Sequence, residues 1–167
     1  MQVRLFPTPA QEAALADTLR LCNEAANLVS RIAWTTQTFR NYDLRIHAYG
    51  QLKDVGLSAQ PAQQVIKKVS DAYTTVKAQV RAKLRKPLTK PIGFRRDAAQ
   101  PFDDRCLSWQ VEARTVSIWT TGGRTKGVAF GCSDEQAAAL AAYRKGESDL
   151  VHRDGMWLLI ATCDIPD

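Results

Sequence analysis

The sequence predicts an α+β fold in which a small β module carries a block of helices as an insertion. Three observations support this prediction. Apolar side chains alternate with a period of two in residues 2–6, recur every three or four residues between about 9 and 86, and return to a period of two after Gly93. The length of 167 residues suits one domain with a modest insertion.

The first predicted strand lies in residues 1–7, where Val3 and Leu5 share one face. A helix of about 25 residues follows, because Thr8 and Gln11 have the spacing of a capping box and Pro9 suits the first helical position. Its expected apolar stripe consists of Leu15, Leu19, Cys22, Ala26, Val29 and Ala33.

The helical signal weakens after this stripe, where residues 43–53 are compatible with a short helix. A second long helix is expected from Ser58, and Pro87 and Pro91 are expected to end it. Its predicted buried stripe consists of Ala62, Val65, Ile66, Val69, Tyr73, Val76, Val80 and Leu84.

Strands and one short helix are predicted in the remaining residues. The expected strands lie at 107–111, 116–118 and 128–130, with a turn at Gly122-Gly123. Ser133 and Gln136 form a second capping-box pattern, and the helix that they open is expected to hold Arg144 and Lys145 in its last turn and to close at Gly146.

The last predicted strands, at 149–153 and 156–163, flank Asp154-Gly155, which favours a type I′ hairpin. The chain is therefore divided into three parts. We predict a first strand of the β module at 1–7, a helical block with a basic linker at 8–92, and the rest of the β module with one short helix at 93–167.

Composition excludes several classes of protein. No apolar run approaches the roughly 18 residues that span a bilayer, and no secretory signal is visible, so no membrane partner is expected. The four cysteines lack the CxxC spacing of a zinc site and are interpreted as free thiols, which is typical of a cytoplasmic protein. They are Cys22, Cys106, Cys132 and Cys163.

Positive charge is concentrated in residues 67–96. This stretch has ten basic residues and one acidic residue, a net +9, whereas the rest of the chain sums to −3. A solvated helix face is one explanation, but contact with phosphates would also relieve the self-repulsion and release counterions. The predicted phosphate contacts are Lys67, Lys77, Arg81, Arg85, Lys86, Lys90, Arg95 and Arg96. Phe94 among them offers a ring on which an unpaired base can stack.

Gln60 and Gln63 fall in the first two turns of the second long helix, ahead of the basic residues. A glutamine side chain can make a bidentate contact to adenine in the major groove of DNA. A polar helix face that contacts only solvent is the alternative interpretation.

No catalytic constellation is visible. The sequence lacks a P-loop, a GxSxG turn and an HExxH helix, and Asp103-Asp104 is interpreted as a turn or an ion pair. Two-metal nuclease chemistry needs acidic residues that converge from separate elements, and no such set can be assembled. We therefore assign no catalytic residue, no metal site and no cofactor, and expect no metal-dependent DNA cleavage by these residues.

Four stretches, in order, resemble landmarks of TnpB-type proteins, the RNA-guided nucleases that bacterial insertion sequences carry. VRLFPTPAQEAALADTLRLCNEAAN matches a strand, an LYPT-x-x-Q pattern and a helix that ends near an Asn, here Asn27. LSAQPAQQVIKKVSDAYTTV resembles the SxxxQQ helix with its Ala-Tyr pair, Ala72-Tyr73. FRRDAAQPFDDRCLSW and GESDLVHRDGMWLLIATCDIPD resemble the stretch after the basic linker and the DGxW strand pair.

The resemblance implies a small wedge-like β-barrel with an inserted helical recognition lobe. In that family this half grips a guide RNA and reads a short motif beside the target DNA, while base pairing reads the target itself. The resemblance therefore implies guide RNA and target DNA as partners, with Gln60 and Gln63 near the target-adjacent duplex. It also implies a bacterial, cytoplasmic protein that joins the nucleoid when bound to DNA.

The sequence departs from the family pattern in one respect. It ends where a RuvC-like nuclease domain normally begins, and the catalytic acidic residues and CxxC zinc ribbon of the family have no counterpart in it. Any divalent metal is expected only in that separate or missing nuclease domain.

Two other functions stay open from the sequence. One is a protein-interaction module whose basic helix docks an acidic partner. The other is a stand-alone DNA-binding repressor that uses the two long helices as a helix-turn-helix, although about 20 residues separate them where a tight turn is expected.

Overall fold

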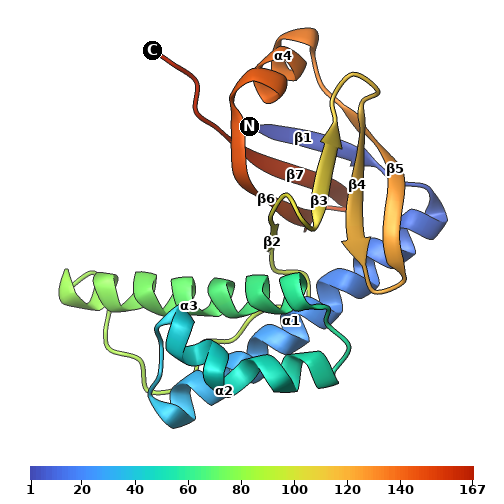
Figure 1. The fold of residues 1–167 in the computed structure, drawn as a ribbon. Coiled ribbons are helices and arrows are strands. Elements are labelled where there is room, and N and C mark those ends of the chain that lie inside the picture. The colour runs from blue at the N-terminus through green and yellow to red at the C-terminus, as the bar shows by residue number, and fades with distance from the viewer. The chain divides into compact units, whose positions relative to one another are not determined.

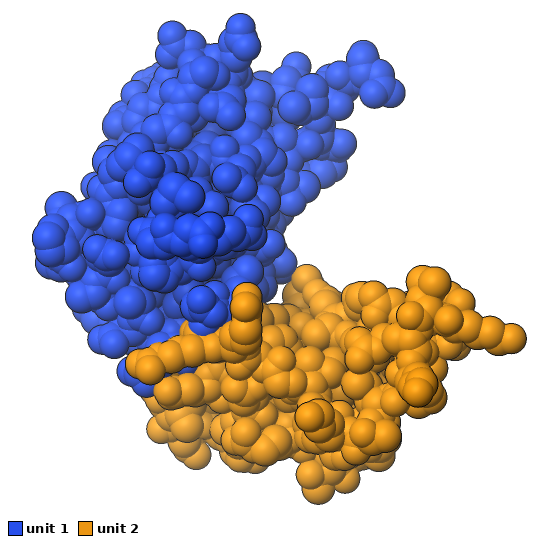
Figure 2. All heavy atoms as spheres, turned by 180° about the vertical axis from the view of Figure 1, so that it is seen from behind, with its two compact units in different colours: residues 1–20, 97–167 blue, residues 21–96 orange.

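The computed structural model describes residues 1–167, which form two compact units (Figure 2). The barrel unit contains residues 1–20 and 97–167, and the helical unit contains residues 21–96. The first turns of the long N-terminal helix thus belong to the barrel unit. The boundaries lie after residues 20 and 96, whereas the sequence predicted them after 7 and 92.

The barrel unit is a seven-stranded antiparallel sheet that is nearly closed into a barrel (Figure 1). Its strand order is β2-β6-β7-β1-β5-β4-β3. The strands are β1 (Gln2–Phe6), β2 (Gln100–Phe102), β3 (Leu107–Gln110), β4 (Thr115–Thr120), β5 (Gly123–Gly131), β6 (Arg144–Arg153) and β7 (Met156–Cys163). Together with four helices this confirms the predicted α+β class.

The first strand lies in the middle of the sheet. β1 pairs with β5 on one side and with β7 on the other, so strands from both ends of the chain complete the same sheet. Val3 and Leu5 are 2% exposed and pack with Leu15 and Leu19 of the helix that follows. This alternation of buried and exposed positions is the pattern that the sequence predicted.

Both predicted capping boxes are confirmed. At the start of α1 (Pro9–Thr36) the Thr8 N–H donates to Gln11 Oε1 over 2.9 Å, and the Gln11 N–H donates to Thr8 Oγ1 over 3.2 Å. At the start of α4 (Asp134–Tyr143), Ser133 and Gln136 make the same reciprocal pair. Each box satisfies two N–H groups that have no partner within the helix.

The predicted end of the fourth helix is wrong. α4 ends at Tyr143, and Arg144 and Lys145 already belong to β6. Arg144 pairs with Cys163 of β7, so strand pairing takes the residues that the sequence placed in the last turn of the helix, and Arg144 also forms an ion pair with Asp104. Gly146, at a φ of 73°, lies where the register between β6 and β7 shifts, so it forms a β-bulge rather than a helix cap.

The last two strands confirm the predicted hairpin, while β2 was missed. Asp154 and Gly155 have φ values of 52° and 75°, and two positive values are the mark of a type I′ turn. β2 is too short for its alternation to be recognised, and Pro101 at its centre lowers its strand propensity. Because β2 pairs only with β6 at the edge of the sheet, the missing N–H of Pro101 is tolerated.

The helical unit consists of the rest of α1, α2 (Asn41–Asp54) and α3 (Ala59–Arg81), which confirms all three predicted helices. The stripe of α3 is buried as far as Tyr73, but Val76 and Val80 are half-buried and Leu84 is 78% exposed. None of the four helices combines the length and apolar composition that crossing a bilayer requires.

α3 ends earlier than its sequence predicted. A Schellman motif closes it, in which the Leu84 N–H donates to the Gln79 carbonyl and the Lys83 N–H donates to the Val80 carbonyl. Lys83 occupies the left-handed position at a φ of 60°, where glycine is usual, so the sequence carries no sign of this ending. Leu84 therefore lies outside the helix and does not extend its buried stripe.

All four cysteines are free thiols, and Cys22 in α1 is fully buried. Burial raises the pKa of the Cys22 thiol to about 12, although the Lys68 ammonium acts to lower it. The ordinary value is 9.0, so the folded chain keeps this proton at pH values where the unfolded chain loses it. Its contribution to the free energy of unfolding is thus complete below pH 9.0 and is lost as the pH rises towards about 12.

We therefore predict that iodoacetamide at pH 8 labels Cys132 and Cys163, which are half-buried, and leaves Cys22 unmodified in the folded chain. Mass spectrometry of the digested protein measures this, with urea-unfolded protein as the control in which all four thiols react. Labelling of Cys22 at the rate of the half-buried thiols would contradict its assigned burial.

Candidate nucleic-acid interface

The two units differ strongly in charge. The helical unit has fourteen Lys and Arg residues against four Asp and Glu residues, a net +10. The barrel unit has nine against thirteen, a net −4. The positive charge of the whole chain therefore belongs to the helical unit, and an anionic partner is attracted to that unit.

Most predicted phosphate contacts lie on exposed surface. They occupy the C-terminal half of α3 and the segment that follows it, and the exposed members are Lys77, Arg81, Arg85, Lys86, Lys90, Arg95 and Arg96. Lys67 is half-buried and pairs with Asp71, one turn further along α3, over 3.1 Å. Both charged side chains of this pair reach solvent, and such a pair contributes little stability, so Lys67 can exchange Asp71 for a phosphate at small cost.

Polar side chains of α1 hold the basic segment that returns from α3. Asn27 donates through Nδ2 to the Phe94 carbonyl over 3.0 Å and accepts from the Phe94 N–H over 2.7 Å. Asn23 Nδ2 donates to the Arg96 carbonyl over 3.1 Å. Ser30 Oγ donates to the Ile92 carbonyl over 2.6 Å.

The spacing of these contacts along α1 matches their spacing along residues 92–96. Positions 23, 27 and 30 share one face of α1, and their partners are every second residue of the segment, at 96, 94 and 92. We call residues 92–96 the return segment. The α1 contacts fix its backbone, so Arg95 and Arg96 are presented from an anchored chain.

Tyr73 anchors the start of the return segment. Tyr73 belongs to α3, and its side chain is fully buried. Its hydroxyl accepts from the Ile92 N–H over 3.0 Å and lies 2.8 Å from Ser30 Oγ. The Ala-Tyr pair noted in the sequence thus supplies a buried hydrogen-bonding group between two helices and the return segment.

Phe94 is the ring that the sequence offered for stacking on an unpaired base. It is half-buried, and the Lys68 ammonium lies 5.3 Å from its ring centroid. Lys68 also donates to Asn23 Oδ1 over 2.7 Å. One face of the Phe94 ring is therefore already in contact with a cation, which leaves less of it for stacking on a base.

Gln60 and Gln63 are both half-buried near the start of α3. Gln63 lines a cavity of about 440 Å³ together with Tyr42, Arg45, Ile46 and Tyr49 of α2. Tyr42 and Ile46 are 76% and 72% exposed, so Gln63 lies beside an open apolar and aromatic surface. This surface combines an amide, a cation and two phenol rings.

Sequence reasoning missed the α2 surface. The signal was present, because α2 has apolar residues on both faces. Leu44, Ala48 and Leu52 are buried, whereas Tyr42 and Ile46 recur at a spacing of four on the other side.

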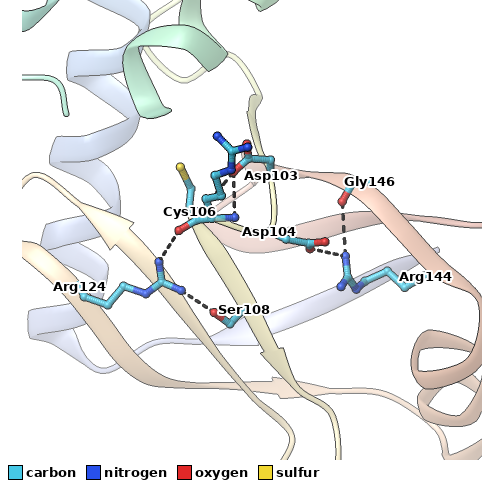
Figure 3. A network of polar contacts seen from close by, with 8 residues as sticks. Asp103, Asp104, Cys106, Ser108, Arg124, Arg144 and Gly146 are labelled. Atoms are coloured by element: carbon cyan, nitrogen blue, oxygen red, sulfur yellow. Dashed lines mark hydrogen bonds and ion pairs between the residues drawn. The ribbon is translucent and has the colours of Figure 1, made fainter. Parts of the chain in front are cut away.

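The acidic pair Asp103-Asp104 is structural, as the sequence predicted (Figure 3). Asp103 Oδ1 accepts from the N–H groups of Arg105 and Cys106, and Asp104 Oδ1 lies 2.8 Å from Arg144 Nη1. The Arg124 guanidinium nearby donates to the Arg105 carbonyl and to Ser108 Oγ. No group of three or more His, Cys, Asp or Glu side chains in residues 1–167 is placed to hold a metal ion.

No family model matches the chain, and no curated protein matches it significantly. The assignment of function therefore rests on the residues and geometry described above.

Proposed function

We propose that this chain is the nucleic-acid-binding part of a TnpB-type RNA-guided DNA endonuclease, in which the helical unit contacts guide RNA and the DNA motif beside the target. The observation that supports nucleic-acid binding is the net +10 of the helical unit against −4 in the barrel unit, and the TnpB type is proposed on the four sequence landmarks. DNA cleavage, and the divalent metal that it needs, belong in this proposal to a RuvC-like nuclease domain that is not within these residues. Such a complex works in the bacterial cytoplasm.

The exposed cations of α3 and the return segment supply the affinity. Each phosphate that they neutralise releases a condensed counterion, and this entropy gain is largely independent of sequence. The α1 contacts to the return segment reduce the entropy that Arg95 and Arg96 lose on binding, because their backbone is already ordered.

Selectivity for a DNA motif needs contacts to base edges, which the cations do not provide. Gln63 is suited to this role because its amide both donates and accepts and because Arg45 lies in the same cavity to hold a neighbouring phosphate. Tyr42 and Tyr49 offer rings for contact with sugars or bases.

Cross-linking tests where the nucleic acid lies. The full chain, bound to an RNA that carries 4-thiouridine, is irradiated and digested, and the cross-linked peptides are identified by mass spectrometry. We expect cross-links in residues 67–96 and in α2. Cross-links confined to the barrel unit would contradict the proposed interface.

We predict that Gln63→Ala lowers the discrimination between a preferred and a scrambled target-adjacent duplex by about 1–3 kcal/mol. Non-specific binding should hardly change, since no charge is removed. The measurement compares both duplexes in the complex with guide RNA and, where required, the nuclease domain.

Gln79→Ala is the matched control, because Gln79 lies on the same helix, far from the α2 surface. An equal loss on both duplexes would make Gln63 a positioning residue, and no loss on either would leave it a solvated helix residue.

A further inference from the structure

We propose that the helical unit holds one unstacked nucleotide of a bound strand, with its base in an aromatic cavity beside α3 and its phosphate at Lys77. This inference rests on the proposed function and names a subsite within it.

The first cavity has a volume of about 360 Å³ and lies among the end of α1, the last turns of α3 and the chain after α3. Its size falls within the range of about 300–1,000 Å³ that small-molecule sites usually have. Its apolar lining consists of Trp34, Phe39, Tyr73, Val76, Val80, Pro87 and Leu88.

The aromatic residues of this cavity differ in how much of each ring is exposed. Tyr73 is fully buried, and its hydroxyl is bonded to the return segment, so its ring does not move independently. Phe39 packs on it with the ring centroids 4.8 Å apart and the planes tilted by 44°. Trp34 is half-buried, and part of its ring therefore stays open to a planar guest, whereas the Phe39 ring is already in contact with Tyr73 and Lys77 and serves as an edge of the cavity.

The second cavity adjoins the first, and most of the residues that line it are polar or charged. It has a volume of about 510 Å³, and Gln37, Phe39 and Lys77 line both cavities. Lys77 Nζ lies 3.7 Å from the Phe39 ring centroid, so the ammonium is held at the wall between them. The further polar lining consists of Thr38, Arg40, Asp43 and His47.

Charge identifies the class of guest. Lys77 and Arg81 are the only charged residues that line the aromatic cavity, and Asp43 is the single acidic residue in the polar one, against Lys77 and Arg40. A nucleotide has a flat base and, on its sugar, a phosphate, and these two groups match an aromatic cavity with cations at its rim. An apolar protein side chain would fill the first cavity and leave these cations without a counter-charge.

The test uses the full chain and three twelve-nucleotide probes: uridine RNA, thymidine DNA and a ribose-phosphate strand without bases. Trp34→Leu removes the stacking surface and keeps the charge. We expect it to weaken binding of a base-bearing strand by roughly 5- to 150-fold, which is the range for one stacked base. Binding of the strand without bases should be unchanged, and Trp34→Phe should restore most of the loss. The RNA and DNA arms show which strand supplies the nucleotide.

Tyr143→Leu, at a 38% exposed ring of the barrel unit, is the matched control and should change nothing. Circular dichroism and thermal melting establish that each variant is folded. If Trp34→Leu fails to fold, Trp34→Phe and Lys77→Gln are compared with wild type on strands with and without bases; an equal preference for bases in all three would overturn the proposal.

The results distinguish a failure of the proposed nucleotide subsite from a failure of the proposed function. If wild type binds all probes with a steep salt dependence and Trp34→Leu binds as tightly, the subsite is wrong and the function stands. If wild type binds none of the probes, the proposed function itself fails. If the cavity instead takes an apolar peptide in competition with the RNA, the nucleotide assignment is overturned.

Discussion

Replacing Arg81, Arg85, Arg95 and Arg96 together with Ala is expected to reduce the salt dependence of RNA binding more than any other change of similar size. Each lost phosphate contact on a single strand makes the slope of log affinity against log salt shallower by about 0.7, so four contacts correspond to nearly 3 units. The affinity loss should be similar for all sequences, because phosphates carry no sequence information. Filter binding between 50 and 200 mM salt measures both quantities.

The fold is expected to survive this substitution. All four side chains are exposed, and Arg96 bonds to Asn23 through its backbone carbonyl, which alanine retains. In the matched control, four exposed cations of the barrel unit are replaced with Ala: Arg4, Lys126, Lys145 and Arg153. This control variant has the same net charge as the variant of the helical unit. Equal slopes for the two variants would show that total charge, and not this face, controls binding.

The second large effect is expected from Asn27→Ala, which removes no charge. The substitution leaves the N–H and the carbonyl of Phe94 without their partner, and an unsatisfied pair of this kind costs about 1–3 kcal/mol in the free energy of unfolding. The return segment should loosen, so RNA affinity should also fall. Urea unfolding measures the first effect, and hydrogen exchange of the Phe94 amide measures the release of the segment directly.

Gln51→Ala is the control for this experiment, since Gln51 is an exposed amide of the same unit whose contact is with its own helix at His47. A protected Phe94 amide in Asn27→Ala would mean that the α1 contacts do not hold the return segment.

Local signals explain why much of the fold could be predicted. Capping boxes, a type I′ turn and periodic apolar stripes are properties of neighbouring residues, and they were found where the sequence placed them, except that the stripe of α3 is buried only as far as Tyr73. Two errors arose where a distant residue decides. Arg144 belongs to β6 because it pairs with β7, and β2 exists only as a partner of β6. The end of α3 was missed for a local reason, since Lys83 takes the left-handed position at which glycine is usual.

The candidate interface divides in the same way. The basic cluster is a compositional feature and was visible in the sequence. The aromatic cavity was not, because it brings Trp34 and Phe39 next to Val80 and Leu88 through helix packing. A partial signal existed in Asn23, Asn27 and Ser30, which are polar residues at helical spacing beside the apolar stripe of α1 and which hold the return segment.

The most direct test of nucleic-acid binding by the helical unit is the salt dependence of wild-type affinity for single-stranded RNA, measured beside polyglutamate of equal charge. Eight predicted phosphate contacts correspond to a slope of about −5 to −6 at roughly 0.7 per contact. We predict a slope steeper than about −4 and tighter binding of RNA than of polyglutamate, because only RNA offers bases to the aromatic rings. A shallower slope, or polyglutamate that binds as tightly as RNA, would contradict the account and favour an acidic protein partner.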